Sequence, residues 1–213
     1  DVYIMKFTRD MLKLTKEYHL IDDLEYYLLT NNIYKIRKWQ QENISDISNI
    51  ITGYHMSLIS SVEMFDIFSD FINNKDSDGN TALINAVQSK NMDLIKLLLG
   101  YPKIDVNILD AVGNTALIHA IIDGKQIIVQ LLLTHPKIDV NLTQNNANFT
   151  PLMFAIKFDK TNIAVLLLNR PEIDVMLKNN ENENALELSL SMNAVISGMI
   201  TKLMLEKLHI YGS

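Results

Sequence analysis

The sequence predicts an all-α fold in which helix–turn–helix units stack side by side as a solenoid. Two observations predict it. The tripeptide Ile-Asp-Val recurs at Ile104, Ile138 and Ile173, at intervals of 34 and then 35 residues. Each copy follows a proline, and a run of three leucines precedes that proline. A period of this length is that of one supersecondary unit, so the chain is expected to repeat a single structural element.

Each unit contains two apolar segments. The first is short, follows a threonine and has an alanine at its centre: Ala86, Ala120 or Ala155. The second is longer and ends in the leucine triplets at 97–99, 131–133 and 166–168. This pattern predicts two antiparallel helices in each unit. A weaker fourth copy begins at Asn184-Ala185-Leu186.

The residues around these segments indicate where the helices begin and end. The threonines Thr81, Thr115 and Thr150 can each accept a hydrogen bond from a free N–H of the first helical turn. Pro151 follows Thr150 at the first helical position. Its fixed φ suits a helix, and the N–H that it lacks would have no partner within the helix there. Gly79 and Gly113 precede the first helix where a tight turn is expected. Pro102, Pro136 and Pro171 lack the N–H that a continuing second helix requires, so that helix must end before them.

At this point the sequence resembles the ankyrin repeat family. The T-P-L-H-x-A signature of that family is met by residues 150–155 and, with alanine in place of proline, by residues 81–86 and 115–120. The Asp-Val-Asn run of the family occurs at 105–107 and 139–141. The resemblance implies an ankyrin-repeat solenoid whose helix pairs are joined by hairpin-like turns. It implies four repeats, at 74–107, 108–141, 142–176 and 177–213, the last being a C-terminal cap.

The sequence departs from the family pattern in two places. The histidine that usually follows T-P-L is replaced by Ile84, Ile118 and Met153. The glycine that usually separates the two helices is replaced by Lys90, Lys125 and Lys160 or by a neighbour, with Gly124 close by. Neither departure changes the predicted fold.

Residues 1–73 form a degenerate segment. A helix is expected from about Lys6 to Leu20, a helix–turn–helix over Asp23–Trp39, and a further degenerate repeat from about Thr52 to Asn73. Because the terminal units of a solenoid need one polar face, we interpret this segment as a cap. The alternative is a small separate interaction domain, which the aromatic residues Tyr26, Tyr27, Tyr34 and Trp39 favour.

The other end of the chain is expected to close the array. Residues 195–208 are apolar at helical spacing and are predicted to form the second helix of the fourth repeat. A cap must present polar side chains to solvent. Four charged residues are predicted to form this wet face: Glu187, Lys202, Glu206 and Lys207.

Little in the sequence points to catalysis. The five histidines are scattered, no glycine-rich phosphate loop occurs, and the chain has no cysteine. His119 lies on the apolar side of a predicted first helix, where it is expected to be a core or interface residue. We therefore expect a non-enzymatic protein with no catalytic residue, no cofactor and no metal site.

Charge and hydropathy narrow the expected partners. The net charge of −6 gives no basic surface for phosphates, and the one cationic cluster, Lys35-Arg37-Lys38, is small, so no nucleic acid is expected. No run of 18 apolar residues and no signal peptide is visible, so no membrane association is expected. The absence of cysteine fits an intracellular, cytoplasmic location, or the host cytoplasm if the chain comes from a virus or an intracellular bacterium.

Protein binding is the class of function that remains after catalysis, nucleic-acid binding and membrane association. In the ankyrin family partners meet the turn tips and the exposed side of the first helices, which form a concave strip. We call the matching positions of this sequence the binding strip. The candidates are Asp78, Asn80, Val112, Asn114, Ile122, Asp123, Phe149, Lys157, Phe158, Glu181 and Glu183.

The middle of the binding strip is apolar and its ends are polar or acidic. Val112, Ile122, Phe149 and Phe158 stand where a repeat needs no apolar residue, and apolar residues rimmed by polar ones are typical of a hot spot. The alternative is that the turn before Thr150 refolds and buries Phe149 or Phe158.

The hot-spot hypothesis makes a prediction. The exposed carboxylates Glu181 and Glu183 favour a partner with a basic rim. Replacing Phe149 and Phe158 by serine is expected to weaken binding and leave thermal unfolding nearly unchanged. Leu131→Ala, as a buried leucine, is expected to destabilise the chain.

Two functional classes fit the sequence. One is a monomeric, non-catalytic interaction module, and its composition, rich in Asn, Ile and Lys, suggests a host-directed adaptor of a virus, symbiont or parasite. The other is a regulatory or targeting portion of a larger enzyme.

Overall fold

The computed structural model describes residues 35, 71–143, 146–191, 198 and 201–206. These residues form helices, turns and loops, with no strand among them. The chain divides into two compact units, Asp1–Ala86 with Asp93–Ile104, and Val87–Met92 with Asp105–Ser213. Each unit is described by itself.

The first described repeat contains helix α7 (Ala82–Gln88) and helix α8 (Met92–Leu99). The N–H of Ile84 donates to the Thr81 hydroxyl at 3.4 Å, so the threonine caps α7 as predicted. Helix α8 ends at the last residue of its leucine triplet, before Pro102. The start of α7 and the end of α8 therefore lie where the sequence predicts them.

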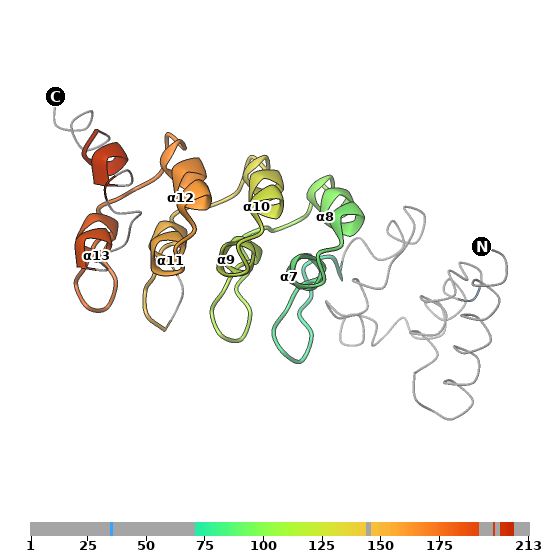
Figure 1. The fold of residues 1–213 in the computed structure, drawn as a ribbon. Helices are drawn as coiled ribbons and strands as arrows, with labels where there is room; N and C mark the ends of the chain where they lie inside the picture. Colours follow the sequence, from blue (N-terminus) through green and yellow to red (C-terminus); the bar gives the residue numbers. More distant parts are fainter. Residues whose placement is uncertain (1–34, 36–70, 144–145, 192–197, 199–200, 207–213) are drawn as a thin grey trace. The chain divides into compact units, whose positions relative to one another are not determined.

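The second unit contains three successive repeats. Their helices are α9 (Ala116–Ile122), α10 (Gln126–Leu133), α11 (Pro151–Lys157), α12 (Thr161–Leu168) and α13 (Ala185–Ser191). The first helices α9, α11 and α13 pack side by side in one layer, and α10 packs on α12 in the other (Figure 1). The loops that precede α9, α11 and α13 project away from α10 and α12 (Figure 1). This is the all-α stack of helix pairs predicted from the sequence.

Side-chain caps fix the starts of the first helices. Thr115 accepts from the N–H of Ile118, and Thr150 accepts from the N–H of Met153, each at 3.2 Å. Pro151 occupies the first turn of α11, as predicted. In the fourth repeat Asn184 replaces the threonine and forms a reciprocal pair with Glu187, in which each side chain accepts from the other residue's N–H.

A left-handed backbone recurs at two places of the described repeats. One is the turn before the first helix, where the left-handed residue is Gly79, Gly113, Asn148 or Asn182. Asparagine is one of the few residues that tolerate it. Between the two helices the left-handed residue is Lys90, Gly124 or Asp159. The residue at the place of the family's glycine is therefore Lys90 in the first described repeat, as predicted. In the next two repeats it is the residue just before the predicted lysine, Gly124 and Asp159.

The Asp-Val-Asn runs join neighbouring repeats. The Asn107 amide donates to the Lys137 carbonyl at 2.8 Å and accepts from the N–H of Asp139 at 2.9 Å. Asn141 makes the same two bonds one repeat later, with Glu172 and Asp174. These asparagines therefore have a structural role, because each side-chain amide forms hydrogen bonds with two backbone groups of the following loop.

The apolar core follows the repeat. Leu132 and Leu167 are fully buried in the middle of their triplets, and so are the central alanines of the first helices. Leu131 is only half-buried, so its use as a buried control is wrong. The first leucine of the triplet lies beside the buried stripe of its helix, and Leu132 is the correct choice.

Several predictions fall outside the described residues. The N-terminal helices and the aromatic residues of that segment lie there, and of the cationic cluster only Lys35 is described, as an exposed helical residue. Of the predicted last helix, residues 198 and 201–206 are described and helical. No helix in the described part of the chain is both long and apolar enough to cross a lipid bilayer.

Candidate functional site

The turn tip of the second described repeat is built around Asp110. Its Oδ1 accepts from the N–H groups of Val112 and Asn114, at 3.0 and 2.8 Å. The N–H of Asp110 in turn donates to the Asn114 carbonyl at 2.9 Å. One carboxylate oxygen therefore accepts from two N–H groups of the turn and stabilises its conformation.

The second oxygen of Asp110 ties the tip to helix α9. His119 Nε2 lies 2.6 Å from Asp110 Oδ2, and the side chains are 20% and 4% exposed. Because a carboxylate only accepts, Nε2 carries the shared proton. The sequence predicts His119 as a core or interface residue, and its bond to Asp110 was not predicted. The signal was the nine-residue spacing to Asp110, which only the hairpin and helix together bring into contact.

The same tip recurs in other repeats with other residues. In the first unit Asp76 holds the N–H groups of Asp78 and Asn80, and its second oxygen accepts from the Asn85 amide at 2.9 Å. In the fourth repeat Asn179 holds the N–H groups of Glu181 and Glu183. The turn thus needs only one side-chain oxygen, and the partner on the helix varies.

An aromatic cluster surrounds the first helix of the third described repeat. Phe154 stands at the place of His119, and its ring lies 5.5 Å from that of Phe149 and 6.1 Å from that of Phe158, measured between centroids. The Phe154 and Phe158 rings are nearly parallel, at 2°. The Lys157 ammonium lies 4.8 Å from the centre of the Phe149 ring, within cation–π range.

The expectation of an exposed Phe149 is wrong. Phe149 is only 8% exposed, and Asn80, at the same position of the first described repeat, is 9% exposed. This position lies between the left-handed turn residue and the capping threonine, where the chain turns under the tip. The alternative in which the phenylalanine is buried is therefore correct for Phe149.

The other candidates differ in exposure. Val112 is 55% exposed and Phe158 is 39% exposed, while Ile122 and Asn114 are half-buried. Asp123, Lys157 and Glu181 are exposed. Glu183 is half-buried and accepts from the Asn179 amide at 3.3 Å. In the first unit, Asp78 is exposed.

The tips of the second unit are also linked to one another. The Asn146 amide donates to the Val112 carbonyl at 3.4 Å, and the Asn180 amide donates to the Asn146 carbonyl at 2.9 Å. Asn148 donates to the Lys178 carbonyl at 2.8 Å. The tips of three successive repeats therefore form a continuous hydrogen-bonded edge.

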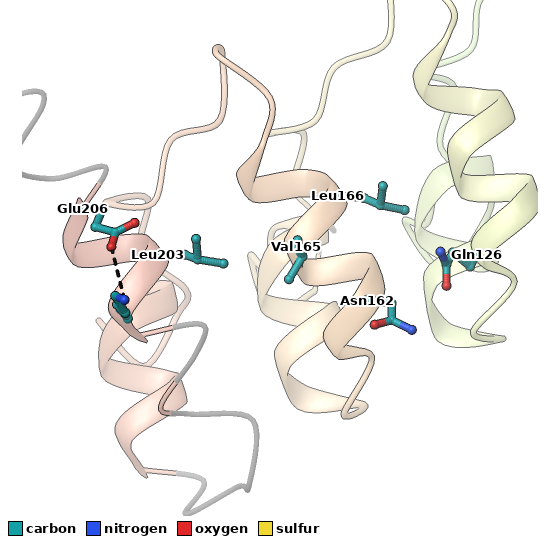
Figure 2. A pocket seen from close by; sticks show the side chains of 7 residues that line it. Gln126, Asn162, Val165, Leu166, Leu203 and Glu206 are labelled. Carbon is teal, nitrogen blue, oxygen red and sulfur yellow. Dashed lines mark ion pairs between the residues drawn. The ribbon is translucent and has the colours of Figure 1, made fainter.

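A second concave feature lies on the other helices. An open groove of about 650 Å³ runs over α10, α12 and residues 201–206. Figure 2 shows Val165 and Leu203 in this groove, with Gln126 and Asn162 at one end and the Lys202–Glu206 ion pair at the other. The ion pair is long, at 3.9 Å, and both side chains are mainly exposed. The groove was not predicted from the sequence. The second-helix residues that line it follow the repeat pattern, so none of them stands out from its equivalents in other repeats.

In the described residues, no group of three or more His, Asp or Glu side chains could hold a metal ion. Partial burial, with a smaller effect of Lys137, lowers the pKa of His135 below its ordinary value of 6.5. His135 lies in the loop after α10, and its Nδ1 accepts from the N–H of Lys137 at 3.3 Å.

Comparison with known families identifies the repeat. The family described as ankyrin repeats (3 copies) matches residues 54–144 and, in an overlapping match, residues 86–179. Together these matches cover more than half of the 213 residues. The first match begins inside the segment interpreted above as degenerate. A comparison with curated proteins found no match.

Proposed function

Because the chain belongs to the ankyrin repeat family, we propose that it is a non-catalytic interaction module that binds a partner protein on the binding strip. Ankyrin repeats generally mediate protein–protein interaction. Within the second unit the strip consists of the linked tips and the exposed side of α9, α11 and α13.

One observation carries this proposal. Val112 and Phe158 are 55% and 39% exposed, although the repeat needs no apolar residue at either position. The Phe154 ring stacks beneath Phe158, and the half-buried Ile122 ends the neighbouring helix. A few side chains, often aromatic, carry most of the binding energy at protein interfaces.

Polar residues complete the surface. Asp123 and Lys157 lie beside the apolar anchors at the ends of α9 and α11, and Glu181 stands on the tip of the next repeat. Exposed charges at a rim affect association rate and partner choice more than affinity. Glu181 and Glu183 favour a basic rim on the partner.

The experiment is a quantitative pull-down from the native cell with a doubly substituted chain, Val112→Ser with Phe158→Ser. Both side chains are exposed, so the variant is expected to unfold at nearly the same temperature as the unchanged chain. The partner is expected to be depleted about tenfold or more, since two lost anchors cost more than the 1.4 kcal/mol that a factor of ten represents.

A matched control separates the strip from any exposed apolar residue. Ile127 is 70% exposed near the start of α10, outside the strip, so Ile127→Ser is expected to leave the partner in place. Equal depletion by both variants, or none by the double variant, would contradict the proposal.

A narrower form of the proposal is a host-directed adaptor acting in the cytoplasm of a host cell. The composition rich in Asn, Ile and Lys supports it. Tagged chain expressed in candidate host cells should then recover a host protein in a Phe158-dependent manner. Recovery of proteins from the source organism alone would instead favour the regulatory or targeting portion of a larger enzyme.

A further inference from the structure

The aromatic cluster of the third described repeat already holds one cation. We define this cluster as Phe149, Phe154 and Phe158. The Lys157 ammonium lies 4.8 Å from the centre of the Phe149 ring. The face of an aromatic ring is electrically negative, so it attracts an ammonium or a guanidinium within about 6 Å of its centre. The surface of the cluster is therefore suited to cations as well as to apolar groups.

Phe158 adds exposed ring surface to this cluster. Its ring is nearly parallel to the Phe154 ring, and the two centroids are 6.1 Å apart, which is typical of offset stacking. Phe158 is the C-cap residue of α11 and is 39% exposed, so part of its side chain reaches solvent at the end of the helix. A side chain of another protein can therefore contact the Phe158 ring without displacing Phe154.

Two aspartates stand near Phe158 in the fold. Asp159 follows it directly, and Asp123 holds the same position in the preceding repeat, because each is the residue after its helix or the C-cap of α9. Helices α9 and α11 pack side by side, so the backbones of Asp123 and Phe158 are about 10 Å apart, one helix spacing. Both aspartates are exposed, and neither forms an ion pair with another described residue.

We propose that an arginine, presented by a short segment of the partner, stacks on Phe158 and pairs with Asp123. This inference rests on the proposed function, because it places the arginine on the binding strip. An aliphatic side chain packed on the ring would take water from the carboxylates and replace none of their hydrogen bonds, which costs free energy. A guanidinium is planar and stacks on a ring while its N–H groups donate to a carboxylate. The compact, strongly hydrated ammonium of lysine fits this double contact less well.

The surrounding residues indicate what accompanies the arginine. Ile122 is half-buried and precedes Asp123, and Val112 is exposed on the tip of the same repeat, so both can contact aliphatic side chains of the partner. Glu181 adds an exposed negative charge on the tip of the fourth repeat, and the net charge of the chain is −6. Charges of this sign favour a basic partner and speed its association. The segment is therefore expected to carry arginine next to aliphatic residues.

The test uses a library of random linear peptides displayed on phage and selected on the whole chain. The enriched peptides are expected to share one arginine. One of them is then synthesised in two forms, with arginine and with citrulline, which has nearly the same shape but no charge. Isothermal titration calorimetry is expected to show about fivefold weaker binding or more for the citrulline form, because it loses the attraction to the ring and to the carboxylate.

Two variants of the chain separate the contacts. Phe158→Leu keeps an apolar side chain and removes the ring, and Asp123→Asn keeps the shape and removes the charge. Each is expected to weaken binding of the arginine form about fivefold and to change binding of the citrulline form much less. Glu206→Gln is the matched control, since it removes an exposed charge from residues 201–206, outside the binding strip, and should leave both affinities unchanged. Thermal unfolding of all three variants checks that they are folded.

Each other outcome overturns the arginine contact. Peptides that need Phe158 but lack arginine, or that bind equally well with citrulline, leave the binding strip in place and exclude the arginine. An arginine peptide that binds Phe158→Leu and Asp123→Asn as tightly as the unchanged chain uses another surface. A library that yields no binder also contradicts the proposal, because a short arginine segment is the ligand it names. The binding strip as such fails only if the native partner is retained by Val112→Ser with Phe158→Ser.

Discussion

The second and third described repeats share a scaffold and differ at their tips. In both, a threonine caps the first helix, the second helix ends with the leucine triplet and the middle leucine is fully buried. In the second repeat the tip is tied to the helix by Asp110 and His119. In the third, Phe149, Phe154 and Lys157 stand in the corresponding region. The shared positions hold the stack, and the chemistry of the tip is therefore able to vary.

The two repeats also differ in which apolar side chains reach solvent. Val112 is exposed at the tip of the second repeat, whereas in the third Phe149 is buried and Phe158 is exposed. The two repeats thus offer one apolar anchor each, fixed by different means. The following predictions test this comparison.

The largest effect is expected from Phe149→Ala. Removal of this buried ring takes away the contact with Phe154 and the surface under Lys157. Truncating a buried phenylalanine typically lowers the free energy of unfolding by about 3–5 kcal/mol. Urea unfolding followed by circular dichroism measures it. Phe158→Ala, at the exposed edge, is the control and should cost clearly less. Equal losses would mean that both rings belong to the core.

The shared scaffold is tested by Leu132→Ala and Leu167→Ala. Both leucines are fully buried at the same position of the two repeats, so each substitution is expected to cost about 2–5 kcal/mol. The half-buried Leu131→Ala should cost less. Chemical denaturation of the three variants provides the comparison, and a much smaller loss in one repeat would show that the two scaffolds are not equivalent.

The polar tip is tested by Asp110→Ala and Asp110→Asn. Alanine removes the acceptor for two N–H groups and for His119, and leaving such groups unsatisfied costs about 1–3 kcal/mol. Asparagine keeps one oxygen for the turn, as Asn179 does in the fourth repeat, and should recover part of that loss. Thermal unfolding of both variants distinguishes these cases. Equal losses would show that the bond to His119 matters more than the turn.

The smallest effect concerns pH. The pKa of His135 is lowered in the folded chain, chiefly by burial, so folding favours its neutral form. Its contribution to stability is therefore present above its ordinary pKa of 6.5 and is lost as the pH falls through the lower, folded value. Arg170 stands at the same place in the third repeat.

The measurement is the difference in the free energy of unfolding between the unchanged chain and His135→Gln as a function of pH. The difference should shift in favour of the variant below neutrality and stay constant above it. A difference that is independent of pH would show that His135 does not titrate differently on folding.

The sequence predicts the scaffold because the scaffold repeats. Capping threonines, helix-ending prolines and leucine triplets each act within a few residues, so their physics is visible in one unit and is reinforced by the next. The left-handed turn was predicted where it is glycine, at Gly79 and Gly113, and was missed where it is Asn148 or Asn182. Those asparagines are chemically unremarkable in a chain with many of them.

The candidate site was harder to predict for a different reason. Exposure of Phe149 depends on how the tip folds over the helix, which involves residues of two elements and cannot be inferred from spacing alone. The pair of Asp110 and His119 joins a turn to a helix across nine residues. In each case the information lies in what packs against a residue and not in the residue itself.

The most direct test of the account is the affinity of the captured partner for two single variants, Phe158→Ser and Ile127→Ser, measured by isothermal titration calorimetry. Both remove an exposed apolar side chain, one inside the binding strip and one outside it. The account predicts that Phe158→Ser raises the dissociation constant about tenfold or more while Ile127→Ser leaves it unchanged. Unchanged affinity for Phe158→Ser, in a chain that unfolds at the usual temperature, would contradict the assignment of the binding strip.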